Sequence, residues 1–268
     1  LILPDAEALR LLLVFALIGA ALGAAVFGGF SIFTRIPPRV PILTGAVFGV
    51  SITVVALMLS NEAPVSGLLA IVVFIFISPA LGFFAAFLFD VVISNLFRHS
   101  LQPRMRRIFQ PMQDLTAAFQ AIGHGSNDGQ HAAGVIAALF LSAGLLSTFS
   151  VSGWVIAASS AAIALGTLFG GWQVVEKLAR RITRIRPYQG FSAGLAGGGT
   201  IWLATLAGIP ISSTHVISGA IIGVGATRGT DAVAWGEVKG IVTAWIVTIP
   251  LGIAVAYLMY WLVILFAA

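Results

Sequence analysis

The sequence predicts an all-α fold, a polytopic bundle of transmembrane helices. Of the 268 residues, 59% are hydrophobic and only 9% are charged, whereas a soluble domain carries roughly 25% charged residues. The mean hydropathy of +1.06 agrees with this. The apolar runs are about 20 residues long, which suits membrane-crossing helices, because the strands of a membrane barrel alternate over about 10 residues. We therefore expect a multi-pass integral membrane protein in the lipid bilayer of the plasma (inner) membrane.

The charged residues predict the topology of the chain. Its net charge is +5, but the basic residues gather in two clusters between apolar runs, at 98–107 and 177–186, so they indicate orientation and not nucleic-acid binding. Both clusters should face the cytoplasm, and an even number of crossings should separate them. The absence of cysteine excludes disulfides, a thiol nucleophile and thiolate metal ligands.

The expected membrane segments follow from the apolar runs. The run 65–97 is too long for one upright crossing and contains Pro79, so it forms either one kinked, tilted helix or two short ones. The run 112–149 should cross as a broken helix, and 212–226 should form a short half-helix. In chain order, the segments are 9–33, 41–60, 65–97, 112–149, 151–172, 188–209, 212–226 and 239–265.

One polar stretch interrupts the apolar pattern, and the candidate site is organised around it. Residues 121–131 read Ala-Ile-Gly-His-Gly-Ser-Asn-Asp-Gly-Gln-His. An ionisable group in a membrane segment costs several kcal/mol, so Asp128 should face protein or water. The glycines favour an unwound, discontinuous helix here. Its expected partner is 208–215, where Pro210 ends one run and three hydroxyl residues open the next.

An internal repeat underlies these segments. The pattern Thr-Gly-Ala-Val-Phe-Gly-Val at 44–50 parallels Ser-Gly-Ala-Ile-Ile-Gly-Val at 218–224, and Ser78-Pro79 parallels Ile249-Pro250, in both cases about 170 residues further along the chain. Inverted repeats with discontinuous helices are typical of secondary transporters. We divide the chain into a partial, degenerate first-repeat region (1–97), a basic polar connector (98–111) and a second-repeat transport region (112–268).

Both motifs resemble signatures of the inorganic phosphate transporter (PiT) family, which includes sulfate permeases. Segment 124–130 is similar to its second His-Gly-x-Asn-Asp-Ala-Gln signature, with Gly129 in place of alanine, and 208–215 is similar to its Gly-x-Pro-Val-Ser-Thr-Thr-His signature. The resemblance runs from about residue 78 to the C-terminus. It implies two inverted repeats with the substrate between them. The first copy of each motif is missing or degraded here, which indicates a truncated sequence, a partner chain supplying the other half, or a lost activity; we expect truncation.

The polar residues divide into a cation set and an anion set. Asn127 and Asp128 offer oxygen ligands to a hard cation such as Na+, and Asp128 is also a candidate proton carrier. The alternative for both is a structural hydrogen bond. The hydroxyls at a helix N-terminus suit phosphate, although N-capping alone would explain them. The predicted phosphate-binding residues are Ser126, Gln130, Ser212, Ser213 and Thr214.

The histidines have a functional and an ordinary interpretation. His124 and His215 are candidates for a proton relay, and together with His131 for a transition-metal site. The ordinary interpretation, which we prefer, is a neutral imidazole that donates to a loop carbonyl. Thr200 and Thr205 are expected to bond the preceding turn of their own helix, with a cation-ligand role as the weaker alternative. The glycine run 197–199 is expected to serve helix packing.

The leading functional hypothesis is a secondary symporter of inorganic phosphate, driven by Na+ or H+ through alternating access, with no other cofactor and no enzymatic activity. Sulfate is the alternative substrate within the same family. A non-transporting membrane subunit or fragment is a further alternative. An intramembrane serine hydrolase, with Ser212 or Ser213 as nucleophile, is weakly supported because no Gly-x-Ser-x-Gly elbow is present. A homodimer is plausible by analogy.

Overall fold

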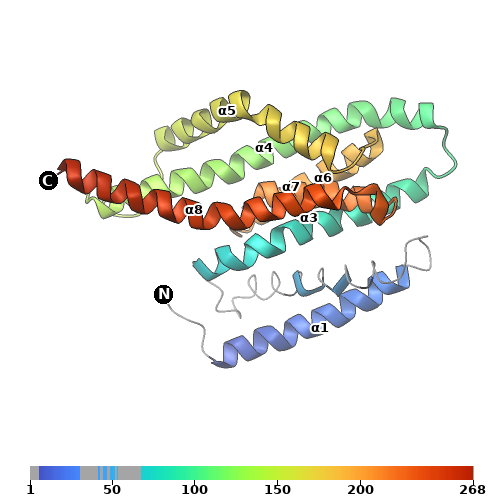
Figure 1. The fold of residues 1–268 in the computed structure, drawn as a ribbon, viewed down its shortest axis with the longest axis horizontal. Helices are drawn as coiled ribbons and strands as arrows, with labels where there is room; N and C mark the ends of the chain where they lie inside the picture. The colour runs from blue at the N-terminus through green and yellow to red at the C-terminus, as the bar shows by residue number, and fades with distance from the viewer. Residues whose placement is uncertain are drawn as a thin grey trace.

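The computed structural model describes residues 6–30, scattered positions between 42 and 53, and 68–267. Every regular element among them is helical, which confirms the all-α prediction (Figure 1). The expected span 41–60 lies largely outside the described residues, as does the degraded first hydroxyl loop. The elements are α1 (Ala6–Phe30), α3 (Leu68–Leu96), α4 (Gln102–Ser142), α5 (Gly153–Glu176), the π-helix η1 (Lys177–Arg181), α6 (Pro187–Leu206), α7 (Ser213–Ala226), the 3-10 helix η2 (Thr230–Ala232) and α8 (Trp235–Ala267).

Three helices are long and apolar enough to cross a membrane, namely α3, α5 and α8, by length and composition within the described residues. α4 is the longest helix but is much more polar, because it carries the candidate motif in its interior. The run 65–97 forms a single helix with Pro79 inside it, so the first of the two alternatives for this run is correct. These apolar helices place the chain in the class of integral membrane proteins.

α4 and α5 run in opposite directions side by side (Figure 1). The basic cluster at the start of α4 and the one between α5 and α6 therefore lie at the same end of the bundle. A pocket lined by Arg106 on one side and by Arg186 and Tyr188 on the other joins the two clusters. The two clusters at one end, joined by two antiparallel helices, agree with the expected even number of passages between them.

α7 is the most deeply enclosed helix, and glycines allow it to approach α3 closely. A Cβ atom on Gly219 would collide with the backbone carbonyl of Pro79, and one on Gly223 would collide with that of Phe83. From the α3 side, a Cβ on Gly82 would collide with the carbonyl of Val216. Small residues at a four-residue spacing permit this backbone contact, which is a common way for helices to associate in lipid.

The same glycine pattern recurs near the N-terminus. A Cβ on Gly49 would collide with the carbonyl of Gly19 of α1, and one on Gly23 of α1 would collide with that of Gly45. In the sequence repeat, Gly45 and Gly49 correspond to Gly219 and Gly223. Both copies of this glycine pair therefore lie backbone to backbone against the helix that packs on them.

α6 packs on α4 through another row of small residues. A Cβ on Gly190 would meet the side chain of Gln113, and one on Gly194 or Gly198 would meet Thr116 or Phe119 respectively. In the triple-glycine run, residues 197 and 198 have close neighbours whereas Gly199 has none within 4 Å. The prediction that this run serves helix packing is confirmed for those two positions.

Candidate functional site

The break between α6 and α7 has a defined geometry. Gly208 has a φ of +67°, a conformation that residues with a Cβ rarely adopt. The N–H of Ile209 donates to Ala204 O at 2.9 Å and that of Gly208 donates to Thr205 O at 3.2 Å, which together form a Schellman motif. Pro210 follows and cannot continue the helix. The predicted discontinuity at this loop is therefore present.

The predicted break at the Asn-Asp motif is wrong, because α4 is helical throughout 121–131. Two of its glycines lie close to neighbouring helices, and a third has no neighbouring atoms. A Cβ on Gly123 would meet the indole ring of Trp202 at 2.9 Å, and one on Gly129 would lie 3.4 Å from the Ser160 hydroxyl, whereas Gly125 has nothing within 4 Å. The motif therefore presents its polar side chains from an intact helix, with its backbone bonded internally.

Asn127 joins α4 to both sides of the α6–α7 break. Its side chain is only 3% exposed. Its Nδ2 group donates to Ile211 O at 3.3 Å and to Asp128 Oδ1 at 3.1 Å. Its Oδ1 atom accepts a hydrogen bond from the Thr205 hydroxyl at 3.3 Å. Both donors and the acceptor of this buried amide are satisfied, so the side chain holds a fixed orientation.

Asp128 meets the first residue of α7. The Ser213 hydroxyl donates to Asp128 Oδ1 at 2.9 Å. Because a hydroxyl has one hydrogen, Ser213 Oγ acts as the acceptor in its 2.7 Å contact with His124 Nδ1. His124 Nδ1 also lies 3.5 Å from Asp128 Oδ2. Ser213 is buried, whereas His124 and Asp128 remain 30% and 37% exposed, so the cluster faces accessible space on one side.

This cluster lacks the order of a hydrolase triad. In a triad the histidine lies between serine and carboxylate and uses one ring nitrogen for each. Here the serine lies between the other two residues, and the same ring nitrogen of His124 faces both of them. The geometry gives no support to the serine hydrolase alternative.

The other two candidate histidines have backbone partners. His131 Nδ1 donates to Asn127 O in its own helix at 2.8 Å, and His215 Nδ1 donates to Ile75 O of α3 at 3.1 Å. The ordinary interpretation therefore describes both of them, although the carbonyls belong to helices and not to loops. Within the described residues, no group of three or more histidine and acidic side chains is arranged to hold a metal ion.

The predicted anion ligands lie in different surroundings. Ser212 is the N-cap of α7, and its hydroxyl accepts from the N–H of His215 at 3.4 Å. Thr214 is exposed beside it, at the second position of the helix. On α4, Ser126 is half-buried and Gln130 is exposed. The structure thus brings the Ser213 hydroxyl into direct contact with the α4 motif. Ser212 and Thr214 flank it at the start of α7, and Ser126 and Gln130 belong to α4 itself.

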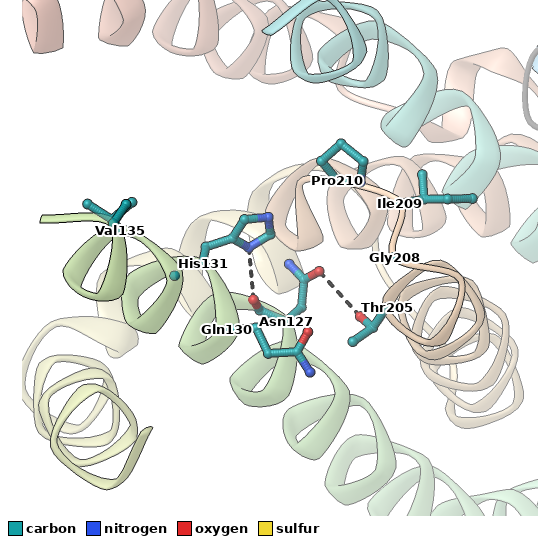
Figure 2. A pocket seen from close by; sticks show the side chains of 10 residues that line it. Asn127, Gln130, His131, Val135, Thr205, Gly208, Ile209 and Pro210 are labelled. Carbon is teal, nitrogen blue, oxygen red and sulfur yellow. Dashed lines mark hydrogen bonds between the residues drawn. The ribbon is translucent and has the colours of Figure 1, made fainter. Parts of the chain in front are cut away.

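A pocket of about 380 Å³ lies where α4 faces the break (Figure 2). The amide of Asn127 and the hydroxyl of Thr205 meet at its wall, and the ring of His131 lies beside them. The lining residues are Asn127, Gln130, His131, Gly134, Val135, Ala138, Thr205, Gly208, Ile209 and Pro210. The contact between residues 128 and 213 borders the same break outside this lining.

Two further side chains build the site, neither of them in the role that the sequence favoured. Thr205 does not bond its own preceding turn and instead contacts Asn127, whereas Thr200 does bond its own turn, at Ala196 O. Ser78 of α3 accepts from the N–H of Ser212 at 3.2 Å and so fixes the entry to α7. The position of Ser78 beside Pro79 was its only signal in the sequence.

An apolar helix bundle in which one helix stops and another begins beside buried polar groups is a feature that many secondary transporters share. The chain belongs to the phosphate transporter family, because that family's model matches residues 2–256. This confirms the resemblance drawn from the two motifs and extends it into the first 77 residues, on which the resemblance did not rest.

Individual relatives agree with this assignment. The chain is 44% identical over 195 residues to a "Probable low-affinity inorganic phosphate transporter" of Rhizobium meliloti (strain 1021), covering 72% of this chain and 58% of that protein. It is 33% identical over 221 residues to a protein of the same description from Bacillus subtilis (strain 168), covering 82% and 66%. The chain thus spans about three fifths to two thirds of these relatives.

One solved structure shares the fold. It is described as "The sodium-dependent phosphate transporter", and the similarity has a TM-score of 0.50 at 23% identity. It covers 91% of this chain and 62% of that one.

Proposed function

We propose that this chain forms one half of the transport site of a secondary symporter that moves inorganic phosphate with Na+ or H+ by alternating access. The observation that carries the proposal is the contact between Ser213 Oγ and Asp128 Oδ1 at 2.9 Å. It joins a membrane carboxylate to the N-terminus of a half-helix, so a cation at the first and an anion at the second occupy neighbouring positions.

The cation half is built around Asp128. Its carboxylate is partly exposed, and the buried Asn127 amide beside it has its oxygen turned toward Thr205. Carboxylate, amide and hydroxyl oxygens suit a hard monovalent cation. We favour Na+ over H+, because oxygen-bearing side chains lie next to one another here and because a solved protein of the same fold is described as sodium-dependent.

The anion half is built on α7. The first N–H groups of a helix have no acceptor within it and carry the positive end of the helix dipole, so they attract phosphate. Ser213 and Thr214 supply such N–H groups together with hydroxyls. The Ser213 hydroxyl also accepts from His124, so a charged His124 would add a positive group next to the anion. Ser126 and Gln130 contact the anion from α4 in this proposal.

Phosphate is preferred to sulfate for a chemical reason. Monohydrogen phosphate donates a hydrogen bond, whereas sulfate only accepts, and Asp128 is an acceptor at the edge of the anion site. The descriptions of both bacterial relatives name inorganic phosphate. Sulfate remains the competitor to test.

The site is completed by a first repeat that supplies a second Asn-Asp motif and a second hydroxyl loop. The repeated glycine packing of Gly45 and Gly49 on α1, and of Gly219 and Gly223 on α3, supports two related inverted units. The missing partner motifs come from a longer form of the chain, from a second copy in a homodimer, or from another chain.

Uptake of radiolabelled phosphate into proteoliposomes tests the proposal. The chain is reconstituted alone and with the N-terminal segment of the Rhizobium relative, under an imposed Na+ or H+ gradient and with sulfate as competitor. We expect Na+-driven uptake that sulfate does not block. Uptake by the chain alone means that its site is completed internally or across a homodimer. Absence of both binding and uptake in either arrangement favours the non-transporting subunit.

A further inference from the structure

A second buried carboxyl group lies away from the candidate transport site. Asp90 of α3 is 0% exposed. It sits at the basic end of the bundle, where α3 meets the start of α6 and the end of α7, whereas Asp128 faces the opposite end of α7. The proposed transport cycle makes no use of this residue.

One oxygen of this carboxyl group lacks a partner. Asp90 Oδ1 is buried and accepts no hydrogen bond from the described residues. The side chains of Gln189 and Ser192 lie near it, but neither makes a hydrogen bond of normal geometry to Oδ1; the Gln189 amide donates to Val224 O at 2.8 Å and the Ser192 hydroxyl donates to Tyr188 O at 2.9 Å. An ionised carboxylate with an unpaired oxygen in a fully enclosed position is costly, so the neutral form is favoured.

The hydrogen bonds of Thr227 also favour a protonated Asp90. Thr227 Oγ1 lies 2.7 Å from Asp90 Oδ2 and 2.8 Å from Val224 O, and both distances are normal for O–H···O bonds. A hydroxyl has a single hydrogen, so it cannot donate to two acceptors. If Asp90 carries a proton on Oδ2, it donates to Thr227, and Thr227 donates to Val224 O. One added proton then accounts for both contacts.

The titratable groups near Asp90 do not pair with an ionised form of its carboxyl group. α3 has no other titratable residue, and the groups that face Asp90 from the neighbouring elements are Tyr188 of α6 and Arg228, which follows α7. Arg228 is exposed, and its Nη2 group donates to Thr183 Oγ1 at 2.7 Å. Among the described residues, no hydrogen bond or ion pair joins its guanidinium to Asp90.

We propose that Asp90 is a proton-binding site, a neutral carboxylic acid whose hydroxyl donates to Thr227 and ties α3 to the C-terminal end of α7. Thr227 is the C-cap of the half-helix whose N-terminus carries Ser213. The protonated Asp90 thus anchors the C-terminal end of α7, whereas the candidate transport site lies at its N-terminal end. This inference does not depend on phosphate transport.

Infrared difference spectroscopy of the full chain in lipid nanodiscs at neutral pH tests the proposal. We expect a carbonyl stretching band of a protonated carboxylic acid in the unmodified chain, lost in Asp90→Asn and retained in Asp231→Asn, the matched change of an exposed acid. Retention of the whole band in Asp90→Asn would overturn the proposal. A band that appears only when choline replaces Na+ would also overturn it, because the site would then hold Na+.

A second variant covers the case in which Asp90→Asn does not fold. Thr227→Val keeps the acid and removes its acceptor, so the acid band should move to higher frequency while its intensity stays the same. An unmoved band would overturn the assigned Asp90–Thr227 hydrogen bond.

Discussion

His215 Nδ1 donates to the backbone carbonyl of Ile75 at 3.1 Å, and this carbonyl lies four residues before Pro79. In an unbroken helix the N–H of residue 79 would donate to it, but proline has no N–H. A side chain of α7 therefore supplies the hydrogen bond that α3 lacks. Ser78, next to this proline, accepts from the N–H of Ser212, so the turn of α3 around Pro79 is a docking point for the start of α7.

His215→Phe should destabilise the chain by about 1–3 kcal/mol, because it leaves a buried carbonyl without a donor. Phenylalanine keeps the stacking on Trp245, whose ring centroid lies 3.9 Å from that of the histidine. The measurement is thermal unfolding in a mild detergent. In a Pro79→Ala background the restored N–H serves Ile75 O, so the cost of His215→Phe should fall. An equal cost in both backgrounds would contradict the assignment.

Gly219→Ala should disrupt the α3–α7 contact, because its methyl group would collide with the carbonyl of Pro79. Overpacking of this kind typically costs about 1–3 kcal/mol. Gly199→Ala is the matched control in a neighbouring helix, since nothing lies within 4 Å of its added Cβ. Size-exclusion profiles and melting curves should show a loss of folded protein for the first variant only.

Asp128→Asn should abolish stabilisation of the chain by Na+. A ligand at about 100 times its Kd stabilises a protein by about 2.7 kcal/mol, and this increment disappears with the site. Asp114→Asn, an exposed change in the same helix, should leave the increment unchanged. Melting curves in NaCl and in choline chloride measure both. A full Na+ response in Asp128→Asn would refute the cation assignment.

Ser213→Ala and Thr214→Ala should weaken phosphate binding more than Na+ binding, because the hydroxyls are assigned to the anion. Loss of one hydrogen bond to a charged ligand corresponds to about 1.5–3 kcal/mol, which is roughly a 10- to 150-fold rise in Kd. Equilibrium binding of radiolabelled phosphate to the full chain, alone or with the added N-terminal segment, measures the change. The reverse order of effects would move both hydroxyls to the cation site.

Thr205→Val should lower Na+ affinity several-fold, since the Asn127 oxygen loses the donor that orients it. Thr200→Val in the same helix removes only a bond to its own preceding turn, so it should leave Na+ affinity unchanged. Na+ titrations followed by intrinsic tryptophan fluorescence compare the two variants. Equal effects would mean that Thr205 contributes only to helix stability.

The sequence carried enough information for the three long apolar helices, the α6–α7 break and the family. Gly208 and Pro210 encode that break locally, through a positive φ and a missing N–H. The intact α4 could not be predicted, because a glycine that accommodates Trp202 looks the same in sequence as one that unwinds a helix. Contacts such as Thr205 with Asn127 join positions 78 residues apart, so they depend on packing that no local pattern records.

The contrast between α7 and α8 has a consequence for how the sequence can vary. Twelve of the 14 residues of α7 are buried, whereas only 6% of the apolar stretch of α8 is buried within this chain. In a saturation mutagenesis library, α7 should reject changes of side-chain volume in either direction. α8 should accept any apolar residue and reject mainly charged ones. The substitutions that it tolerates would therefore depend on the polarity of each side chain and not on its fit against a neighbouring helix.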